Sequence, residues 1–184
     1  MQTEPEFSKE VLSFFLEKIK NSEFAESIKV EERVYILKDF TFCRDKRGKW
    51  QLITGTQQQD IVFYSEHVPK EEFVKGIIKI SGAGMRDKVV IPLAICELKV
   101  PQSMNTHQLI TYSSIASYIK EIFPSCAFYF LLSSNIKRKL MPETVLRQGK
   151  IFDRIFLNWD KDKNTIWGDL KTHFAYLKRI GNIK

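Results

Sequence analysis

The chain has 184 residues, of which 43% are hydrophobic and 12% aromatic, which is enough apolar material for one domain with a core and excludes a disordered chain. Its net charge of +7 suits a polyanionic partner without identifying one. No apolar run is long enough to cross a membrane, and the acidic, polar residues 1–6 do not resemble a signal peptide, so we expect a cytoplasmic protein with no membrane partner.

The first half of the chain predicts a helix followed by a β-meander. Its elements, in order, are a helix at residues 8–21 and extended runs at residues 33–43, 50–54 and 58–65. Ser8 is a candidate cap for the helix. Gly48 lies in the turn between the first two runs, where a positive φ is expected, and Gly55 marks a bend or bulge before the third.

The second half predicts strands and helices in alternation, and then helices alone. The strands are expected at residues 76–81, 89–100 and 126–132, and the helices at residues 105–123, 142–148, 150–159 and 167–180. The run 126–132 is continuously apolar, as in a central strand buried on both faces, whereas Pro92 favours an edge position or a bulge. The order predicts a single α/β domain with a mixed central sheet flanked by helices and a C-terminal helical extension at about residues 134–184.

The cysteines and histidines do not form a metal-binding pattern. Cys43, Cys96 and Cys126 are odd in number and widely spaced, so we expect reduced structural thiols. The three histidines show no zinc-ligand spacing.

Ionisable residues lie at the tips of two apolar runs. Asp60 opens the run 61–64, and Glu97 and Lys99 follow the run 89–96. Because side chains alternate along a strand, Glu97 and Lys99 project from the same face, and Asp60 on a neighbouring strand could lie beside Glu97. Burial of such groups without partners is costly, so the three together indicate a functional site.

This set of residues favours a metal site. Two close carboxylates repel each other, and a divalent cation removes that repulsion. Oxygen ligands from Asp60, Glu97 and the backbone carbonyl of Leu98 suit Mg²⁺ or Mn²⁺. Lys99 could orient or deprotonate a water molecule, or stabilise an anionic transition state. The sequence leaves open a simpler interpretation, in which Glu97 and Lys99 are a surface pair and Asp60 is a turn residue.

The same residues resemble the motif of the PD-(D/E)xK nuclease superfamily, which has a restriction-endonuclease-like αβββαβ core. Asp60 and Glu97-Leu98-Lys99 match the motif, and the resemblance covers roughly residues 8–133. Gln108 and Tyr112 resemble the QxxxY motif of the RecB-like branch, whose residues line the site or contact nucleic acid. A helix face with a core tyrosine and a solvated glutamine accounts for the same spacing.

The chain departs from the family pattern at one position and leaves another undecided. Gln59 stands where a proline commonly precedes the aspartate. The family often has an acidic residue on its first helix that helps to bind a second metal, and the candidates here are Glu10, which we take forward, and Glu17.

The resemblance implies a Mg²⁺- or Mn²⁺-dependent endonuclease that hydrolyses phosphodiester bonds in DNA. Its catalytic residues would be Asp60, Glu97, Lys99, Gln108 and Tyr112. The small chain begins at Met1 without a fused domain, so we expect a stand-alone enzyme of the restriction or defence type, and such enzymes often cut as homodimers. Two alternatives stay open: an RNA endonuclease with the same metal site, as in cap-snatching enzymes, and a nucleic-acid-binding module without catalysis.

Basic residues follow the predicted central strand. Lys137, Arg138 and Lys139 are the best candidates for contact with phosphates. Further lysines and arginines alternate with aromatic residues in the last 40 or so positions, where they could track a nucleic acid. Amphipathic helices with their apolar residues inward explain the same pattern.

Overall fold

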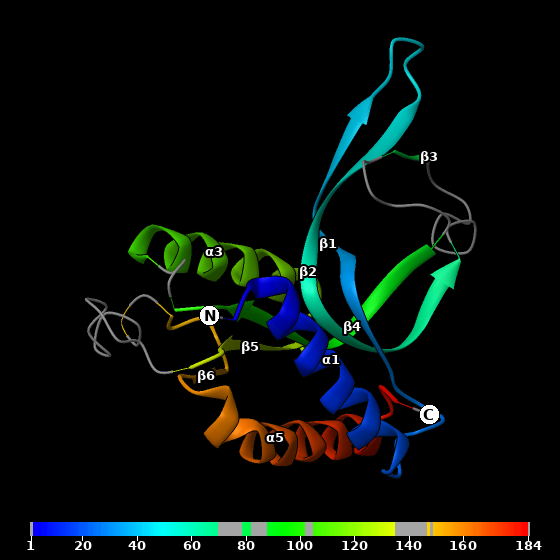
Figure 1. Cartoon of the computed structure of the whole chain (residues 1–184). Helices are drawn as coiled ribbons and strands as arrows, with labels where there is room; N and C mark the ends of the chain where they lie inside the picture. The colour runs from blue at the N-terminus through cyan, green and yellow to red at the C-terminus, as the bar shows by residue number, and fades with distance from the viewer. Residues whose placement is uncertain are drawn as a thin grey trace.

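A computed structural model describes residues 2–69, 79–81, 88–101, 105–134, 147 and 149–183. Its elements in chain order are α1 (Glu4–Lys20), β1 (Lys29–Arg44), β2 (Trp50–Pro69), β3 (Lys79–Ser81), β4 (Lys88–Lys99), α3 (Thr106–Ile122), β5 (Ala127–Leu132), β6 (Arg154–Phe156) and α5 (Trp159–Arg179) (Figure 1). No helix in these ranges is long and apolar enough to span a membrane. The three cysteines are free thiols, as expected.

The strands form one mixed sheet in the order β1-β2-β4-β5-β6, with β3 paired to β2 off this path. β1, β2 and β4 pair antiparallel, whereas β4, β5 and β6 pair parallel. The parallel pair β4 and β5 is joined through α3, because parallel neighbours need a crossover connection. Without the short β3, the order is the αβββαβ core of the predicted fold class, and that prediction is confirmed.

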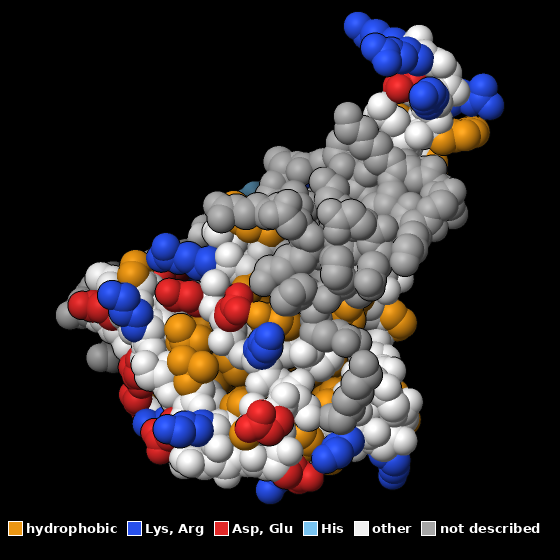
Figure 2. Space-filling model, turned by 90° about the vertical axis from the view of Figure 1, so that its right-hand side faces the viewer, with side chains coloured by type: hydrophobic (Ala, Val, Ile, Leu, Met, Phe, Trp, Pro, Cys, Tyr) orange, Lys and Arg blue, Asp and Glu red, His pale blue; other side chains and the backbone are white. Residues whose placement is uncertain are grey.

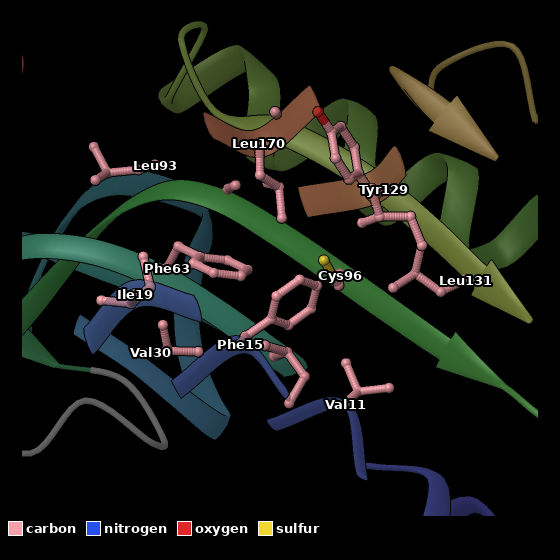
Figure 3. Close-up of a cluster of buried hydrophobic side chains, with 14 of the residues drawn as sticks. Val11, Phe15, Ile19, Val30, Phe63, Leu93, Cys96, Tyr129, Leu131 and Leu170 are labelled. Carbon is pink, nitrogen blue, oxygen red and sulfur yellow. The ribbon is translucent and has the colours of Figure 1, made fainter. Parts of the chain in front are cut away.

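Helices cover both faces of the sheet, and each face has its own apolar core. Along β2, Ile61 and Phe63 belong to the core shared with α1 and α5, whereas Val62 and Tyr64 belong to the core shared with α3. Figure 3 shows the first core, in which Phe15 of α1 packs edge-on against Phe63, with 5.0 Å between ring centroids. β5 is buried along its whole length, as expected for a central strand.

Two helices begin earlier than their sequence patterns predict. α1 starts after Thr3, not at Ser8, because Thr3 and Glu6 form a capping box at its first turn. The hydroxyl of Ser8 donates instead to a carboxylate oxygen of Glu32 on β1, at 3.1 Å. α5 starts at Trp159 and not at residue 167, since the Asn158 side chain caps it by accepting from a backbone N–H.

The hairpin of β1 and β2 is longer and more continuous than predicted. β2 runs through Gly55 without a break, so the two separate runs expected there are one strand. The irregularity lies in β1, where the register shifts between Leu37 and Asp39, opposite Gly55. A side chain on Gly55 would collide with the Asp39 carboxylate, so the glycine permits this close approach. Past this point the hairpin leaves the body of the molecule as an arm (Figure 1).

Pro92 does cause a bulge, as predicted, although β4 is an interior strand. The pairing of β4 with β2 skips a residue, because Phe63 pairs with Ala94 and Tyr64 pairs with Pro92. The skipped residue, Leu93, keeps a partner for its carbonyl, since His173 Nε2 of α5 lies 3.0 Å from that oxygen.

The helix predicted at residues 150–159 is wrong. Asp153 instead accepts hydrogen bonds from the backbone N–H of Phe128, at 2.6 Å, and from the Lys120 ammonium, at 2.7 Å. These bonds hold the chain beside β5, where residues 154–156 pair with it as the parallel strand β6. The helix predicted at residues 142–148 lies, except for residue 147, outside the described residues.

Candidate active site

Asp60 and Glu97 lie opposite each other on neighbouring strands. Ile61 pairs with Cys96 in the antiparallel ladder of β2 and β4, so one further step places Asp60 across from Glu97. Both side chains point to the α3 face, because their alternate neighbours Val62 and Ile95 belong to the core on that face. The backbone N–H of Leu98 donates to Asp60 Oδ2 at 2.8 Å, which fixes this carboxylate against the end of β4.

The ammonium of Lys99 lies among three carboxylates. Its Nζ is 3.1 Å from Glu97 Oε1, 3.8 Å from Asp60 Oδ2 and 3.8 Å from Glu4 Oε1. The same atom lies 4.7 Å from the ring centroid of Tyr112, a cation–π distance. Only 7% of the Lys99 side chain is exposed, so this cation is held by its partners and not by water.

The charges of this cluster depend on one another. Burial, followed by the nearby Asp60 carboxylate, raises the pKa of Glu97 to about 8. Burial alone would lower the pKa of Lys99, but the carboxylates of Glu97 and Asp60 outweigh burial and raise that pKa above its usual value. Burial also raises the pKa of the Tyr112 hydroxyl, which therefore stays protonated at neutral pH. Lys99 is thus a stable cation, whereas burial and the Asp60 carboxylate favour the protonated form of Glu97.

The donor set fits a hard divalent cation held by few protein ligands. Within the described ranges, no group of three or more His, Cys, Asp or Glu side chains is arranged to hold a metal ion. Asp60 and Glu97 supply two opposed carboxylates, and Mg²⁺ commonly binds one or two carboxylates and completes its shell with water and substrate phosphates. The Asp60 side chain is 37% exposed, which leaves the site open to a ligand from solvent.

The first helix contributes Glu4 to this cluster, and Glu10 lies elsewhere. Both carboxylate oxygens of Glu10 are engaged, one by the indole N–H of Trp159 at 2.7 Å and the other by the Gln2 amide at 2.8 Å. Glu17 is exposed further along the helix. Sequence reasoning missed Glu4 because it began the helix at Ser8, and the available signal was the capping box of Thr3 and Glu6.

Gln108 and Tyr112, the two QxxxY positions, have different surroundings. Gln108 closes a capping box at the start of α3: its side-chain oxygen accepts from the Asn105 N–H at 3.0 Å, and its own N–H donates to Asn105 at 2.9 Å. Tyr112, one turn later, packs on Phe130 and lies under the Lys99 ammonium. The structure therefore brings Tyr112 to the carboxylate cluster and gives Gln108 a role in capping.

The basic residues proposed for phosphate contact fall into two groups. Lys137, Arg138 and Lys139 lie outside the described residues. In α5 the apolar residues do face inward, since Trp159, Ile166, Leu170, Phe174 and Leu177 are buried. The amphipathic-helix interpretation therefore holds for that segment.

No protein-family model matches this sequence, and no curated protein matches it either. Among solved structures, a chain of the native BbvCI A2B2 tetramer, determined at low resolution, is similar with 12% sequence identity and a TM-score of 0.45. The similarity covers 74% of this chain and 45% of that chain, so this chain spans less than half of the other's length. The fold described above rests on the strand order and pairing of the chain itself.

Proposed function

We propose that the chain is a metal-dependent nuclease of the PD-(D/E)xK type that hydrolyses phosphodiester bonds in DNA. The observation that supports this proposal is the Lys99 ammonium, buried between Asp60, which lies midway along β2, and Glu97, which lies near the end of β4. These are the three motif positions, and they come together from distant parts of the sequence on one face of the sheet.

A purely structural ion cluster is a poorer explanation of this geometry. Buried ion pairs are weak sources of stability, because desolvation of the charges offsets their attraction. Here the buried pair of Glu97 and Lys99 is joined by Asp60 and Glu4, whose side chains are partly exposed. The cluster is therefore open to solvent on one side. A binding site requires such an opening, whereas a purely structural ion pair does not.

Each residue has a role that its surroundings support. Asp60 and Glu97, with the Leu98 carbonyl, would hold the metal, and Glu4 takes the place of Glu10 as the first-helix carboxylate. When bound, Mg²⁺ or Mn²⁺ would offset the two negative charges and polarise the phosphodiester. Lys99 would donate to the anionic oxygen that develops during hydrolysis, since its partners keep it protonated. Tyr112 covers the Lys99 ammonium on the α3 side and limits its contact with water.

The finer parts of the proposal follow the family resemblance. They are an endonuclease of the restriction or defence type, DNA in preference to RNA, a cytoplasmic location and a homodimer as the cutting species. They are separable from the metal site, and the experiment that follows reads out the polymer, the mode of cutting and the dimer.

The test is incubation of the purified chain with supercoiled plasmid and with single-stranded RNA, each with Mg²⁺, Mn²⁺ or EDTA. We expect plasmid cleavage that requires the metal and falls at least about a hundredfold in Glu97→Gln and in Lys99→Ala, because each change removes a charge used in the transition state. Discrete bands would indicate sequence-specific cutting, and a smear would indicate non-specific cutting. A steep dependence of the cleavage rate on protein concentration would indicate that a dimer cuts.

Matched controls separate the site from a general loss of charge. Glu121→Gln and Lys171→Ala remove one carboxylate and one ammonium from exposed positions and are expected to leave cleavage unchanged. Cleavage that survives both Glu97→Gln and Lys99→Ala would sink the proposal, as would a folded wild-type protein that cuts neither polymer with either metal. If only the RNA is cleaved, the substrate of this site is RNA and not DNA.

A further inference from the structure

The hairpin arm carries large apolar side chains where none of the described helices covers them. Phe40, Phe42 and Trp50 are 50%, 53% and 55% exposed, although residues of these types are usually buried. They lie beyond the register shift at Asp39, where Figure 1 shows the ribbon of β1 and β2 extending away from the helices. Several large apolar side chains exposed on one arm indicate a contact surface.

These side chains gather on one face of the ribbon. In the antiparallel register Phe40 pairs with Thr54, Phe42 with Leu52, and Arg44 with Trp50, and paired residues project from the same face. The Phe40 and Phe42 rings lie edge to face at 6.2 Å between centroids. The Arg44 guanidinium lies 4.9 Å from the centroid of the Trp50 ring. The face is therefore apolar along its length and cationic at its end.

The tip of the arm is strongly basic. Figure 2 shows blue side chains gathered at the end of the arm around one red one. The tip carries four exposed cations, Arg44, Lys46, Arg47 and Lys49. None of the four forms an ion pair with any residue that the structure describes. Like charges on one short turn repel one another, and an anionic partner would relieve that repulsion.

The one acidic residue at the tip is used to shape the turn. Asp45 Oδ1 accepts from the backbone N–H groups of Arg47, at 2.8 Å, and Lys49, at 2.9 Å. The Asp45 N–H donates to the Lys49 carbonyl at 2.9 Å, and Gly48 adopts a positive φ of 76°. The turn therefore has a defined conformation that depends on Asp45 and the backbone, and the cationic side chains project from it.

We propose that the tip of this arm binds double-stranded DNA, with its cations on phosphates and its two-stranded end at a groove. The choice of DNA rests on the proposed function, whereas the choice of surface rests on the arm alone. The major groove of B-form DNA admits a two-stranded β-ribbon, and cations on both sides of a turn reach phosphates on both groove walls. In the part of the chain that the structure describes, β3 pairs with Gln51–Ile53 of β2, and the last turn beyond them consists of β1 and β2 alone.

The features of the tip favour duplex DNA over other partners. A second copy of the chain would bring two tips of the same charge together if the arms met symmetrically. The deep, narrow major groove of A-form RNA does not admit a ribbon. Arg44 already covers one face of Trp50, which leaves less aromatic surface for the stacking that single strands use.

The test measures binding in EDTA, so that cleavage plays no part. A fluorescently labelled 30-base-pair duplex is titrated with wild type, with the tip variant Lys46→Ser/Arg47→Ser/Lys49→Ser, and with Lys161→Ser/Lys171→Ser/Lys178→Ser, which removes the same charge from exposed positions of α5. The Asp45 bonds reach backbone N–H groups, so the tip variant keeps its turn. We expect the tip variant to bind the duplex at least about tenfold more weakly at 0.1 M salt. The negative slope of log association constant against log salt concentration should become less steep by about 2. The α5 variant should change affinity less than about twofold.

The outcomes separate this inference from the proposed nuclease. Binding that depends on the tip, in a protein that never cuts with Mg²⁺ or Mn²⁺, supports the arm and overturns the nuclease. Metal-dependent cutting, together with equal duplex affinity in wild type and tip variant, supports the nuclease and overturns the arm as a DNA-binding element. A wild type that binds single strands more tightly than the duplex, or a tip variant that changes only the oligomeric state, also overturns the arm as a duplex-binding element.

Discussion

Glu97 combines deep burial with a site that is open on one side. Its side chain is 5% exposed and lies across from a second carboxylate, and together these two conditions raise its pKa to about 8 from the usual 4.5. Lys99 opposes this effect but does not cancel it, because the same ammonium is shared with Asp60 and Glu4. The free energy of unfolding should therefore depend on pH in the absence of metal.

The sign of this dependence follows from the proton that each state binds. Between about pH 4.5 and pH 8 the folded chain keeps a proton on Glu97 that the unfolded chain releases. The unfolding free energy contributed by Glu97 should thus fall as pH rises through this window, by at most about 1.4 kcal/mol per pH unit. Glu97→Gln cannot ionise and should lose less stability than wild type between pH 6 and pH 8 in EDTA, measured by urea unfolding.

The pH dependence of stability should be specific to Glu97. Glu121→Gln, an exposed change on α3, should keep the pH dependence of wild type. If Glu97→Gln loses as much unfolding free energy as wild type over the same pH range, Glu97 is ionised in the folded protein throughout and its raised pKa is wrong.

Among elements, α3 decides between two explanations of the same residues. The spacing of Gln108 and Tyr112 matches a nuclease motif, but the structure places the Gln108 side chain in the capping box with Asn105. A capping residue contributes about 1 kcal/mol to stability and does not touch the reacting groups. Tyr112 contacts the Lys99 ammonium, so only the second motif position is expected to affect the chemistry.

Substitutions at the start of α3 test this division. Gln108→Ala and Asn105→Ala should each lower the unfolding free energy by about 1 kcal/mol and change the cleavage rate only a few-fold. Tyr112→Leu should reduce the cleavage rate more than either, because it uncovers the Lys99 ammonium. A Gln108→Ala variant that keeps wild-type stability and loses cleavage would return this glutamine to the active site.

Strand periodicity is predictable from the sequence, whereas helix ends and short strands depend on further interactions. Alternation predicted that Glu97 and Lys99 share a face, because the period of a strand is fixed by its backbone. Capping competes with periodicity for helix ends, so Thr3 and Asn158 begin their helices where the apolar pattern alone does not. β6 was mistaken for a helix because its three residues become a strand only by pairing with β5.

At the scale of the whole molecule, long-range geometry was the least predictable part. The alternating pattern of residues 33–43 predicts a strand but not the point at which that strand extends past the described helices. The exposure of Phe40 and Phe42 is therefore visible only in the structure, and so is the arm. The approach of Glu4 to Lys99 likewise depends on how α1 lies against the sheet.

A metal ion bound by Asp60 of β2 and Glu97 of β4 should raise the free energy of unfolding of the whole chain. A cation that binds only the folded state adds about 2.7 kcal/mol at a concentration one hundred times its Kd. For a chain of this size, that gain corresponds to a rise in the thermal midpoint of about 5 to 10 °C. We expect saturating Mn²⁺ or Mg²⁺ to produce such a rise in wild type and not in Asp60→Asn or Glu97→Gln, measured by scanning calorimetry.

Glu10→Gln, whose oxygen still accepts from Trp159, should keep the full shift, because that carboxylate lies on the α1–α5 side of the sheet. Equal shifts in all four proteins would mean that the cation binds elsewhere, and the carboxylates of β2 and β4 would then be only an ion cluster.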